Sequence, residues 1–440
     1  MTYKRMLQAV MAAGVSVAIG LGLTACSRDY TAAYVYSISA SGGNINGFGV
    51  DYQTGILTQI AGSPFATNFQ SQTAVVRSPD GKFIYVVSGP EDSKVVELAV
   101  GTDGKLYGQH TYSLTGTYPT AAAIDSTGKF LYVTFTYQTG FTPALPGLGG
   151  ITIFPIKPDN TLDTPVTQGG LNYVPVGNNP VGIAVSVPTC TLTPVIKASS
   201  TPTCAVKGSS TNNGWPNAFV YVVDQEASPN ATVLGFAQNV NTGTLTMLSG
   251  TTFDNTLKTY QGVRAGVAPS AVAIDPTGRF VYVTDKIANQ VIAYSIDTVN
   301  TGNLTALRAS PFPTGTATGQ FPVSLTIDPR GKYLYTTNFN SSTLTSFTID
   351  VASGNLSAVA SSTAGNFTTG PRPTCVTIEP ALGTYIYTSN LLDGTISAGK
   401  LNPNTGAISG VQNSPFTVSA LPSCIISVPN GEHSIQLANP

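Results

Sequence analysis

The sequence predicts an all-β protein: a seven-bladed β-propeller in which each blade is a four-stranded antiparallel sheet. Charged residues make up only 9% of the 440 positions, so the helix formers Lys, Glu and Arg are scarce. A strand-like segment around a tyrosine recurs seven times along the chain. A glycine turn follows most of these segments, and units of about 50 residues with four strands each are typical of propeller blades.

Composition excludes several other classes of protein. Hydrophobic residues reach 42%, with 20 Tyr and 18 Phe, which is enough material for a core and excludes a disordered chain. A net charge of −1 and only two histidines exclude a basic nucleic-acid-binding surface. We therefore expect one propeller domain over residues 33–440, and not the two or three domains that the length alone suggests.

Residues 1–25 predict an export signal. Lys4 and Arg5 precede an uncharged apolar run from Met6 to Leu21, which is shorter than the roughly 20 residues that span a bilayer. An ordinary secretory signal is one reading of this segment, and a lipoprotein signal is the other.

The end of the signal favours the lipoprotein reading. Leu23-Thr24-Ala25-Cys26 resembles a bacterial lipobox, in which the cysteine receives a lipid. The resemblance implies a lipidated tether over residues 26–32 that holds the protein at a membrane. Because Ser27 rather than Asp follows the cysteine, it also implies an outer-membrane location in the bacterial envelope.

Seven tyrosines mark the repeat, each inside a short apolar run. They are spaced by 51, 47, 89, 61, 53 and 52 residues, and they are Tyr34, Tyr85, Tyr132, Tyr221, Tyr282, Tyr335 and Tyr387. Turns such as Pro276-Thr277-Gly278 precede most copies and turns such as Thr301-Gly302 follow them, which divides each unit into short strands. The longest spacing locates an insertion at about residues 188–216.

A small residue recurs in the segment before each turn. The seven positions are Ala74, Ala121, Gly182, Ala271, Ser324, Cys375 and Cys424. Small side chains suit the innermost strands, where seven sheets converge on one axis. The seventh segment follows the last tyrosine, so we expect the C-terminal strand at 423–428 to pair with the N-terminal blade and close the ring.

Four cysteines remain besides Cys26, an even number that suits an oxidising compartment. Cys190 and Cys204 lie within the insertion and are expected to staple it. Cys375 and Cys424 occupy equivalent positions on neighbouring inner strands, so they form either a second bridge or two buried free thiols. No Cys or His spacing fits a metal site, and no cofactor-binding motif is present.

Two segments, Asp275–Asp285 and Asp328–Asn338, resemble the lactonase or YVTN-repeat family of seven-bladed propellers. The resemblance implies the propeller fold over the mature chain and, as in the 6-phosphogluconolactonase-like members, chemistry at one mouth of the central channel by a His, a Glu and Arg residues. This chain departs from that set. His110 is expected on an outer strand, and His433 lies in the C-terminal tail.

Two arginines are the candidate ligand-binding residues at the channel mouth. Arg372 directly precedes an inner strand. Arg77 stands where sister strands carry Ile274 and Ile327, so it points into the channel unless a one-residue bulge places it on a solvated turn. Four residues that end the tyrosine strands are expected to cap the following turns: Asp224, Asp285, Asn338 and Asn390.

The sequence is compatible with two functions. The first is a monomeric, lipid-anchored scaffold that binds a glycan, a polymer, a protein or a small lactone. The second is a hydrolase acting on a lactone outside the cytoplasm, which the family resemblance implies. Catalytic residues are not evident, so the choice between binding and catalysis stays open at this point.

Overall fold

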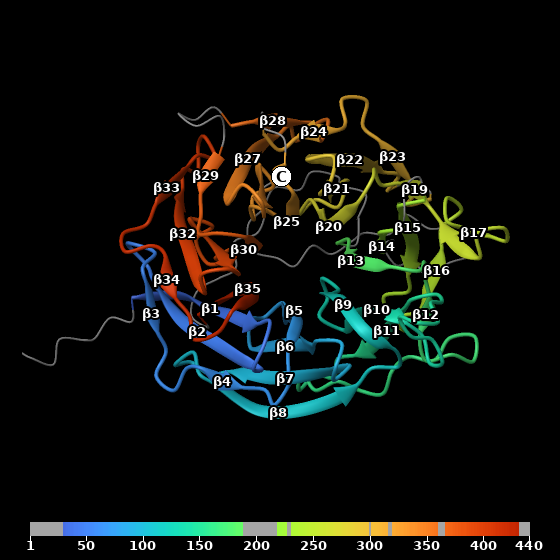
Figure 1. The fold of residues 1–440 in the computed structure, drawn as a ribbon, viewed down its shortest axis with the longest axis horizontal. Coiled ribbons are helices and arrows are strands. Elements are labelled where there is room, and N and C mark those ends of the chain that lie inside the picture. Colours follow the sequence, from blue (N-terminus) through green and yellow to red (C-terminus); the bar gives the residue numbers. More distant parts are fainter. Residues whose placement is uncertain are drawn as a thin grey trace, which may run out of the picture.

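The repeat of the sequence forms a ring of seven sheets around a central channel (Figure 1). The computed structural model describes residues 30–187, 218–226, 230–298, 301–315, 319–359 and 366–430. Within these ranges the chain forms strands and no helix, so no helix there could cross a membrane. The segment expected to be a signal peptide, residues 1–25, lies outside the described residues, as do Cys26, Cys190, Cys204 and His433.

Each blade contains four strands in sequence order from the axis outward, except that the last strand of the chain is the innermost strand of blade 1. From blade 1 to blade 7, the innermost strands are β35 (Pro422–Pro429), β5 (Gln72–Arg77), β9 (Thr117–Ile124), β13 (Pro180–Val185), β20 (Pro269–Ile274), β25 (Pro322–Ile327) and β30 (Pro373–Ile378). The second strands are β1 (Thr31–Ser39), β6 (Phe83–Ser88), β10 (Phe130–Tyr137), β14 (Ala218–Asp224), β21 (Phe280–Asp285), β26 (Tyr333–Asn338) and β31 (Tyr385–Asn390).

The outer half of each blade is shorter and more variable. The third strands are β2 (Asn44–Asp51), β7 (Lys94–Val100), β11 (Gly150–Pro155), β15 (Thr232–Gln238), β22 (Gln290–Ile296), β27 (Thr343–Ile349) and β32 (Thr395–Leu401). The fourth strands are β3 (Leu57–Gln59), β8 (Leu106–Ser113), β12 (Val174–Pro175), β16 (Leu245–Met247), β23 (Leu304–Ala306), β28 (Leu356–Ala358) and β33 (Ile408–Gly410).

Additional short strands cover the outer edge. The third strand of five blades also pairs with β4 (Phe65–Ala66), β19 (Val263–Arg264), β24 (Phe312–Pro313), β29 (Asn366–Thr368) or β34 (Phe416–Thr417). A separate hairpin of β17 (Thr252–Asp254) and β18 (Thr259–Gln261) follows blade 4.

The predicted closure of the ring is confirmed. β35 pairs antiparallel with β1, with Ile426 opposite Tyr36 and Val428 opposite Tyr34. The predicted second bridge is also present: Cys375 and Cys424 form a disulfide with their Cα atoms 4.9 Å apart. The disulfide joins β30 of blade 7 to β35 of blade 1, so the closing seam is held by both a hydrogen-bond ladder and a covalent bond.

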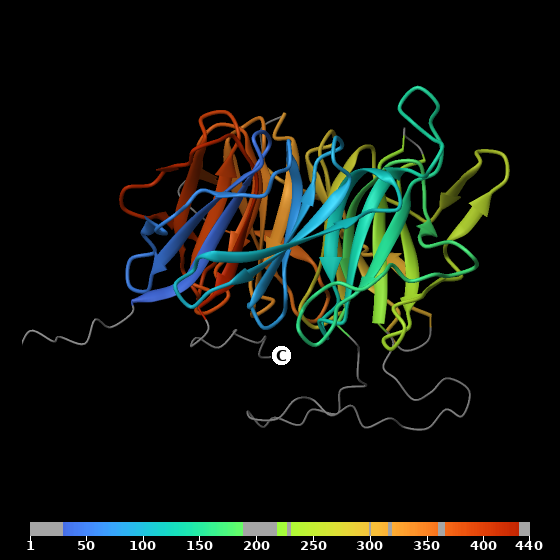
Figure 2. The ribbon, with the colours of Figure 1, turned by 90° about the horizontal axis from the view of Figure 1, so that it is seen from below.

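The seven innermost strands run in the same direction along the channel. Ser270 of β20 donates its hydroxyl to the carbonyl of Pro322 in β25 at 2.8 Å, and Ser423 of β35 does the same to Gln72 in β5 at 2.7 Å. These contacts join equivalent residues at the start of neighbouring strands. The channel therefore has a start mouth, where the inner strands begin, and an end mouth, where they finish; the side view in Figure 2 shows the blades spanning this thickness.

One hydrogen bond recurs at all seven boundaries between blades. A buried tyrosine of the second strand donates its hydroxyl to a carbonyl in the outer hairpin of the following blade. The pairs are Tyr36 to Gly104 (2.6 Å), Tyr85 to Asn160 (2.8 Å), Tyr132 to Gly243 (3.3 Å), Tyr221 to Gly302 (2.6 Å), Tyr282 to Gly354 (2.9 Å), Tyr335 to Gly406 (3.1 Å) and Tyr387 to Gly55 (2.8 Å).

This pattern corrects one prediction. Tyr34 is not the central tyrosine of the first blade, because Tyr36 makes the equivalent bond to Gly104. Tyr34 instead donates to the carbonyl of Thr102, as Tyr385 does to that of Gln53. Tyr34 and Tyr36 are two residues apart in β1, so their side chains lie on the same face of the strand. The sequence motif alone therefore fits either tyrosine.

The acceptor position favours glycine for two reasons. Gly354 has φ +73°, which side-chain-bearing residues rarely adopt, and a Cβ there would lie 2.4 Å from the ring of Phe280. Blade 3 fills this position with Asn160 at φ 65°, and asparagine is among the few other residues that tolerate this conformation. The turn glycines noted in the sequence therefore serve as contact points between blades.

Replacing Tyr282 with Phe should remove one such bond without changing the packing of the ring. We expect the free energy of unfolding to fall by about 1–2 kcal/mol, because the Gly354 carbonyl stays buried without a donor. Denaturant titration measures this change. Tyr107→Phe is the control, since its exposed hydroxyl bonds only to Asp103 at 3.1 Å. Equal stability of Tyr282→Phe and the wild type would contradict the expectation.

Candidate ligand-binding mouth

The residues directly before the inner strands surround the start mouth. Six of these strands have a proline at or near their start. The residues that directly precede these prolines are Tyr118, Asn179, Ala268, Phe321, Arg372 and Leu421. Tyr118, Phe321 and Arg372 have φ of 60°, 58° and 55°, which is uncommon for residues other than glycine. Local bonds hold this backbone: the carbonyls of Phe321 and Arg372 accept from the amides of Phe339 and Leu391, both at 3.0 Å.

Arg372 and Lys286 lie at the two ends of an aromatic pair at this mouth. The Arg372 guanidinium carbon is 5.3 Å from the centre of the Phe339 ring, and the Phe339 and Phe321 ring centres are 6.2 Å apart. The Lys286 ammonium lies 5.8 Å from the Phe321 ring centre and donates to the Gln225 side-chain carbonyl at 3.2 Å. We call Gln225, Lys286, Phe321, Phe339 and Arg372 the mouth arc.

The two cations of the mouth arc have no acidic partner. Neither forms an ion pair within the part of the chain that the structure describes. Arg372 is exposed, whereas Lys286 is partly buried and burial lowers its pKa. A cation over an aromatic face gains about 0.5–2 kcal/mol and keeps its donors free for an incoming anion.

A carboxyl pair lies at the blade 4 end of the mouth arc. Asp224 is fully buried at the end of β14, and one of its oxygens accepts the amide of Asn179 at 2.7 Å. Burial, with a smaller contribution from the neighbouring Glu226, raises the pKa of Asp224 to about 8 against the opposing effect of the Asn179 bond. Glu226 is partly exposed and accepts the Thr259 hydroxyl at 2.5 Å.

From the sequence, Asp224 is expected only to cap a turn. Its pairing with Glu226 is not predicted. The available signal was the spacing of the two acids, since residues two apart in an extended chain point the same way. Asp285 caps the following turn as predicted, accepting the amide of Ala288 at 3.2 Å, and it also accepts the amides of Val267 at 2.8 Å and Ala268 at 3.1 Å from the segment before β20. Asn338 and Asn390 instead donate their side-chain amides to hydroxyls of the neighbouring strand.

Arg77 lies at the other end of the channel. It is the last residue of β5 and pairs with Ile84 in register, while the bulge of this strand lies earlier, between Gln72 and Ala74. The same early bulge occurs in β20 and β25, so Arg77 keeps the position of Ile274 and Ile327 and does not move onto the turn. The two candidate arginines are therefore at opposite mouths and do not form one site.

His110 does not contribute to either candidate mouth. His110 lies on the outer strand β8, as expected, and its Nδ1 is 3.5 Å from a Glu97 oxygen. Within the described ranges no three His, Cys, Asp or Glu side chains form a group that could hold a metal ion.

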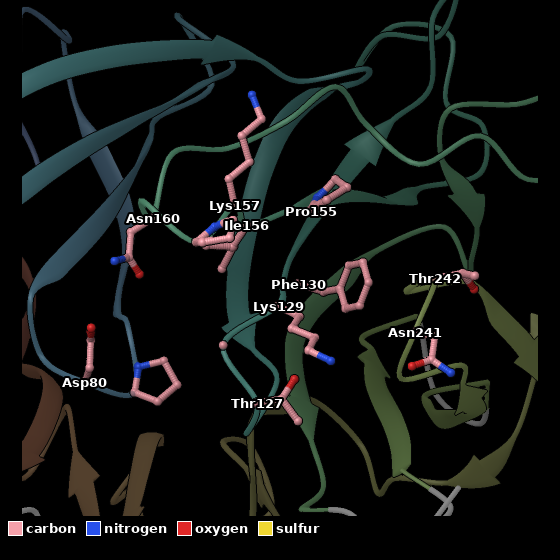
Figure 3. Close-up of a pocket in the computed structure, with 13 residues that line it drawn as sticks. Asp80, Thr127, Lys129, Phe130, Pro155, Ile156, Lys157, Asn160, Asn241 and Thr242 are labelled. Atoms are coloured by element: carbon pink, nitrogen blue, oxygen red, sulfur yellow. The ribbon is translucent and has the colours of Figure 1, made fainter. Parts of the chain in front are cut away.

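A groove of about 670 Å³ lies on the face of the end mouth, between blades 2, 3 and 4. Asp80, Lys129, Lys157, Asn160 and Thr242 are among the residues that line it. Figure 3 shows that the Lys157 side chain extends away from Asp80 and Lys129, so the charged groups do not converge on one point. The start mouth, with its paired cations and rings, is the better candidate site.

Comparison with known proteins agrees with the fold. A family model described as lactonase, 7-bladed β-propeller, matches residues 27–168 and 213–378. A presumed 6-phosphogluconolactonase from Bacteroides uniformis is 20% identical, with a TM-score of 0.65 over 91% of this chain and 100% of that chain. Periplasmic gluconolactonase PpgL of Pseudomonas aeruginosa is 16% identical, with a TM-score of 0.63 over 90% of this chain and 99% of that one. Apo AztD of Citrobacter koseri is 16% identical, with a TM-score of 0.52 over 93% and 100%.

At these identities the solved structures show a shared fold and nothing more. Among curated proteins, none matched the chain.

The buried carboxyl of Asp224 predicts an unusual pH dependence of stability. Its pKa of about 8 in the folded protein lies above the ordinary value near 3.9, so the folded state retains a proton that the unfolded state loses. The resulting stability is present below about pH 4 and is lost as pH rises toward 8. Relative to Asp224→Asn, the wild type should lose up to about 1.4 kcal/mol per pH unit in this window. Denaturant titrations of both proteins at pH 5 and pH 8 measure this loss, and parallel profiles would exclude the raised pKa.

Proposed function

We propose that this chain, which belongs to the lactonase family of seven-bladed β-propellers, is an envelope protein. It binds a small, polyhydroxylated anion at the start mouth. A sugar acid or its lactone is the chemical class that fits. The observation that carries this proposal is the mouth arc, in which Arg372 and Lys286 lie over aromatic rings without an acidic partner among the described residues.

The chemistry of the mouth arc favours a carboxylate ligand. A guanidinium presents parallel donors that match the two oxygens of a carboxylate, and the ammonium of Lys286 adds a second positive charge. Phe321 and Phe339 between the cations offer apolar faces for the carbon skeleton of the ligand. A few polar groups beside aromatic side chains are typical of small-molecule sites.

The lipid anchor remains part of this proposal, and the fold supports its orientation. β1 is antiparallel to β35, so it begins on the face of the end mouth. Residues 26–29 would span about 14 Å at most between a lipid on Cys26 and Tyr30. A lipidated chain would therefore hold the end-mouth face near the membrane and direct the mouth arc away from it.

A second candidate function is hydrolysis of a lactone, and the carboxyl pair of Asp224 and Glu226 is the observation that favours it. Glu226 is partly exposed and would take a proton from a water molecule that attacks the lactone carbonyl. The Lys286 ammonium would stabilise the resulting oxyanion. When the ring C–O bond breaks, Glu226 would return the proton to the leaving oxygen, giving the open hydroxy acid. Asp224 is fully buried and would act only through Glu226.

Calorimetric titration with gluconate tests the binding proposal. Arg372→Met and Lys286→Met should each weaken binding by about 10- to 100-fold, because each removes a charge-assisted hydrogen bond of about 1.5–3 kcal/mol. Lys332→Met is the matched control, since it removes an exposed cation from a turn on the opposite face. Absence of gluconate and glucono-lactone binding, or equal affinity in all variants, would overturn the proposal.

A panel of sugar lactones and acyl lactones tests the second function by measuring acid release at constant pH. If the carboxyl pair is catalytic, Glu226→Gln should lower kcat by at least about 100-fold, the usual scale of a lost general base. Arg372→Ala should raise KM, whereas Arg77→Ala, at the other mouth, should leave the turnover unchanged. Turnover no faster than the buffer rate across the panel would remove hydrolysis and leave binding as the function.

A further inference from the structure

The end mouth of the channel holds a positive charge where sister blades place a neutral residue. At the position equivalent to Arg77 on the inner strand, the six other blades carry Ile124, Val185, Ile274, Ile327, Ile378 and Ser427. Arg77 is thus the single charged side chain in this layer of the channel, and it is partly buried.

The packing of neighbouring residues shows between which two blades the Arg77 guanidinium lies. Side chains alternate along a strand, so Arg77 lies on the same side of β5 as Val75. Val75 packs with residues of blade 1 that include Cys424 and Ile426. In the next seam around the ring, Ile124 occupies the equivalent position and packs with Val76. The Arg77 side chain therefore extends between blades 1 and 2. The equivalent place between blades 2 and 3 is filled by the aliphatic side chains of Val76 and Ile124.

The carboxylates closest in the repeat pattern are already engaged elsewhere. The position after the inner strand is Asp125 in the neighbouring blade 3, and it accepts the amides of Lys129 at 2.8 Å and Phe130 at 2.9 Å. Blade 2 has Ser78 at this position, whose hydroxyl donates to Asp80 at 2.5 Å. Asp80 also accepts the amide of Lys82 at 3.1 Å, so it caps its own turn.

Arg77 itself forms no hydrogen bond or ion pair with the part of the chain that the structure describes. Its pKa is lowered by burial, with no acidic group opposing the effect. A partly buried guanidinium without a counter-charge loses hydration that only a matching anion or channel water can replace.

We propose that the end mouth binds a small monovalent anion, a halide or a carboxylate of formate size, on the Arg77 guanidinium. The apolar seam limits the size of the anion, and the hydroxyl of Ser427 is engaged with the Tyr34 carbonyl at 3.3 Å. Arg77 is consequently the principal donor. This site is independent of the mouth arc, because the two lie at opposite ends of the channel.

Thermal and denaturant unfolding of the chain expressed from Ser27, which retains every strand of the ring, tests the site. Bromide and formate are the probes, added from zero to 200 mM at pH 7, a range of about ten Kd for a site of 20 mM affinity. For wild type, the unfolding constant should fall about tenfold at ten times Kd, because the anion binds only the folded state. Lys82→Met, which removes an exposed cation from the adjacent turn, should respond like the wild type.

Two Arg77 variants give the decisive comparison. Arg77→Met should lose the anion-dependent part of the stability while remaining at least as stable as wild type without salt, since it removes an unpaired charge. Arg77→Lys should keep a weaker response, because it retains the charge without the planar donor set. A bromide-soaked crystal should show an anomalous peak beside Arg77 in wild type and none in Arg77→Met. Identical salt responses of wild type and Arg77→Met, or no bromide at Arg77, would overturn the proposal.

Discussion

The hydrogen bond from a buried tyrosine to the outer hairpin of the next blade is the contact on which the whole ring depends. Each blade has an apolar face on both sides, and this bond fixes how one face lies on the next. The acceptor carbonyl is offered by a residue with positive φ, and at Gly354 the missing Cβ leaves room for the Phe280 ring. Because the same geometry repeats at seven boundaries, small errors in tilt do not accumulate and the last blade meets the first.

The candidate site depends on the regular repeat of the blades and on the positions at which single blades carry different residues. The ring places one residue of each blade at the start mouth, and most of these positions could hold any side chain without affecting the packing between blades. Arg372 and Phe321 occupy such positions, while Lys286 and Phe339 follow the neighbouring second strands. In a chain with so few charged residues, two cations without acidic partners at one mouth form a marked positive site. The mouth arc therefore has carboxyl groups at its blade 4 end and cations on blades 5 and 7.

Much of this architecture could be predicted from the sequence because the repeated tyrosines, turns and small residues mark the strands of each blade. The spacing of residues such as Tyr282 and Tyr335 indicated the blades, and the equivalent places of Cys375 and Cys424 indicated the bridge. The first blade was misread by two residues because Tyr34 and Tyr36 share a strand face, and only the position of Gly104 distinguishes them. The Asp224–Glu226 pair was missed because the raised pKa of Asp224 comes mainly from its burial in the folded ring, which the local sequence does not show. Pattern within a repeat is visible in a sequence, whereas contacts made once between unlike segments are not.

The pairing of β35 with β1 also constrains the order in which the protein can be made. The strand that completes blade 1 is synthesised nearly 400 residues after its partner, so the inner edge of β1 has no partner strand until β35 has been made. The ring therefore cannot close by adding blades from its N-terminus alone. The disulfide then forms between two residues that become neighbours only in that final step. A chain that ends before β35 lacks Cys424, so the oxidised bridge is present only in molecules that contain the closing strand.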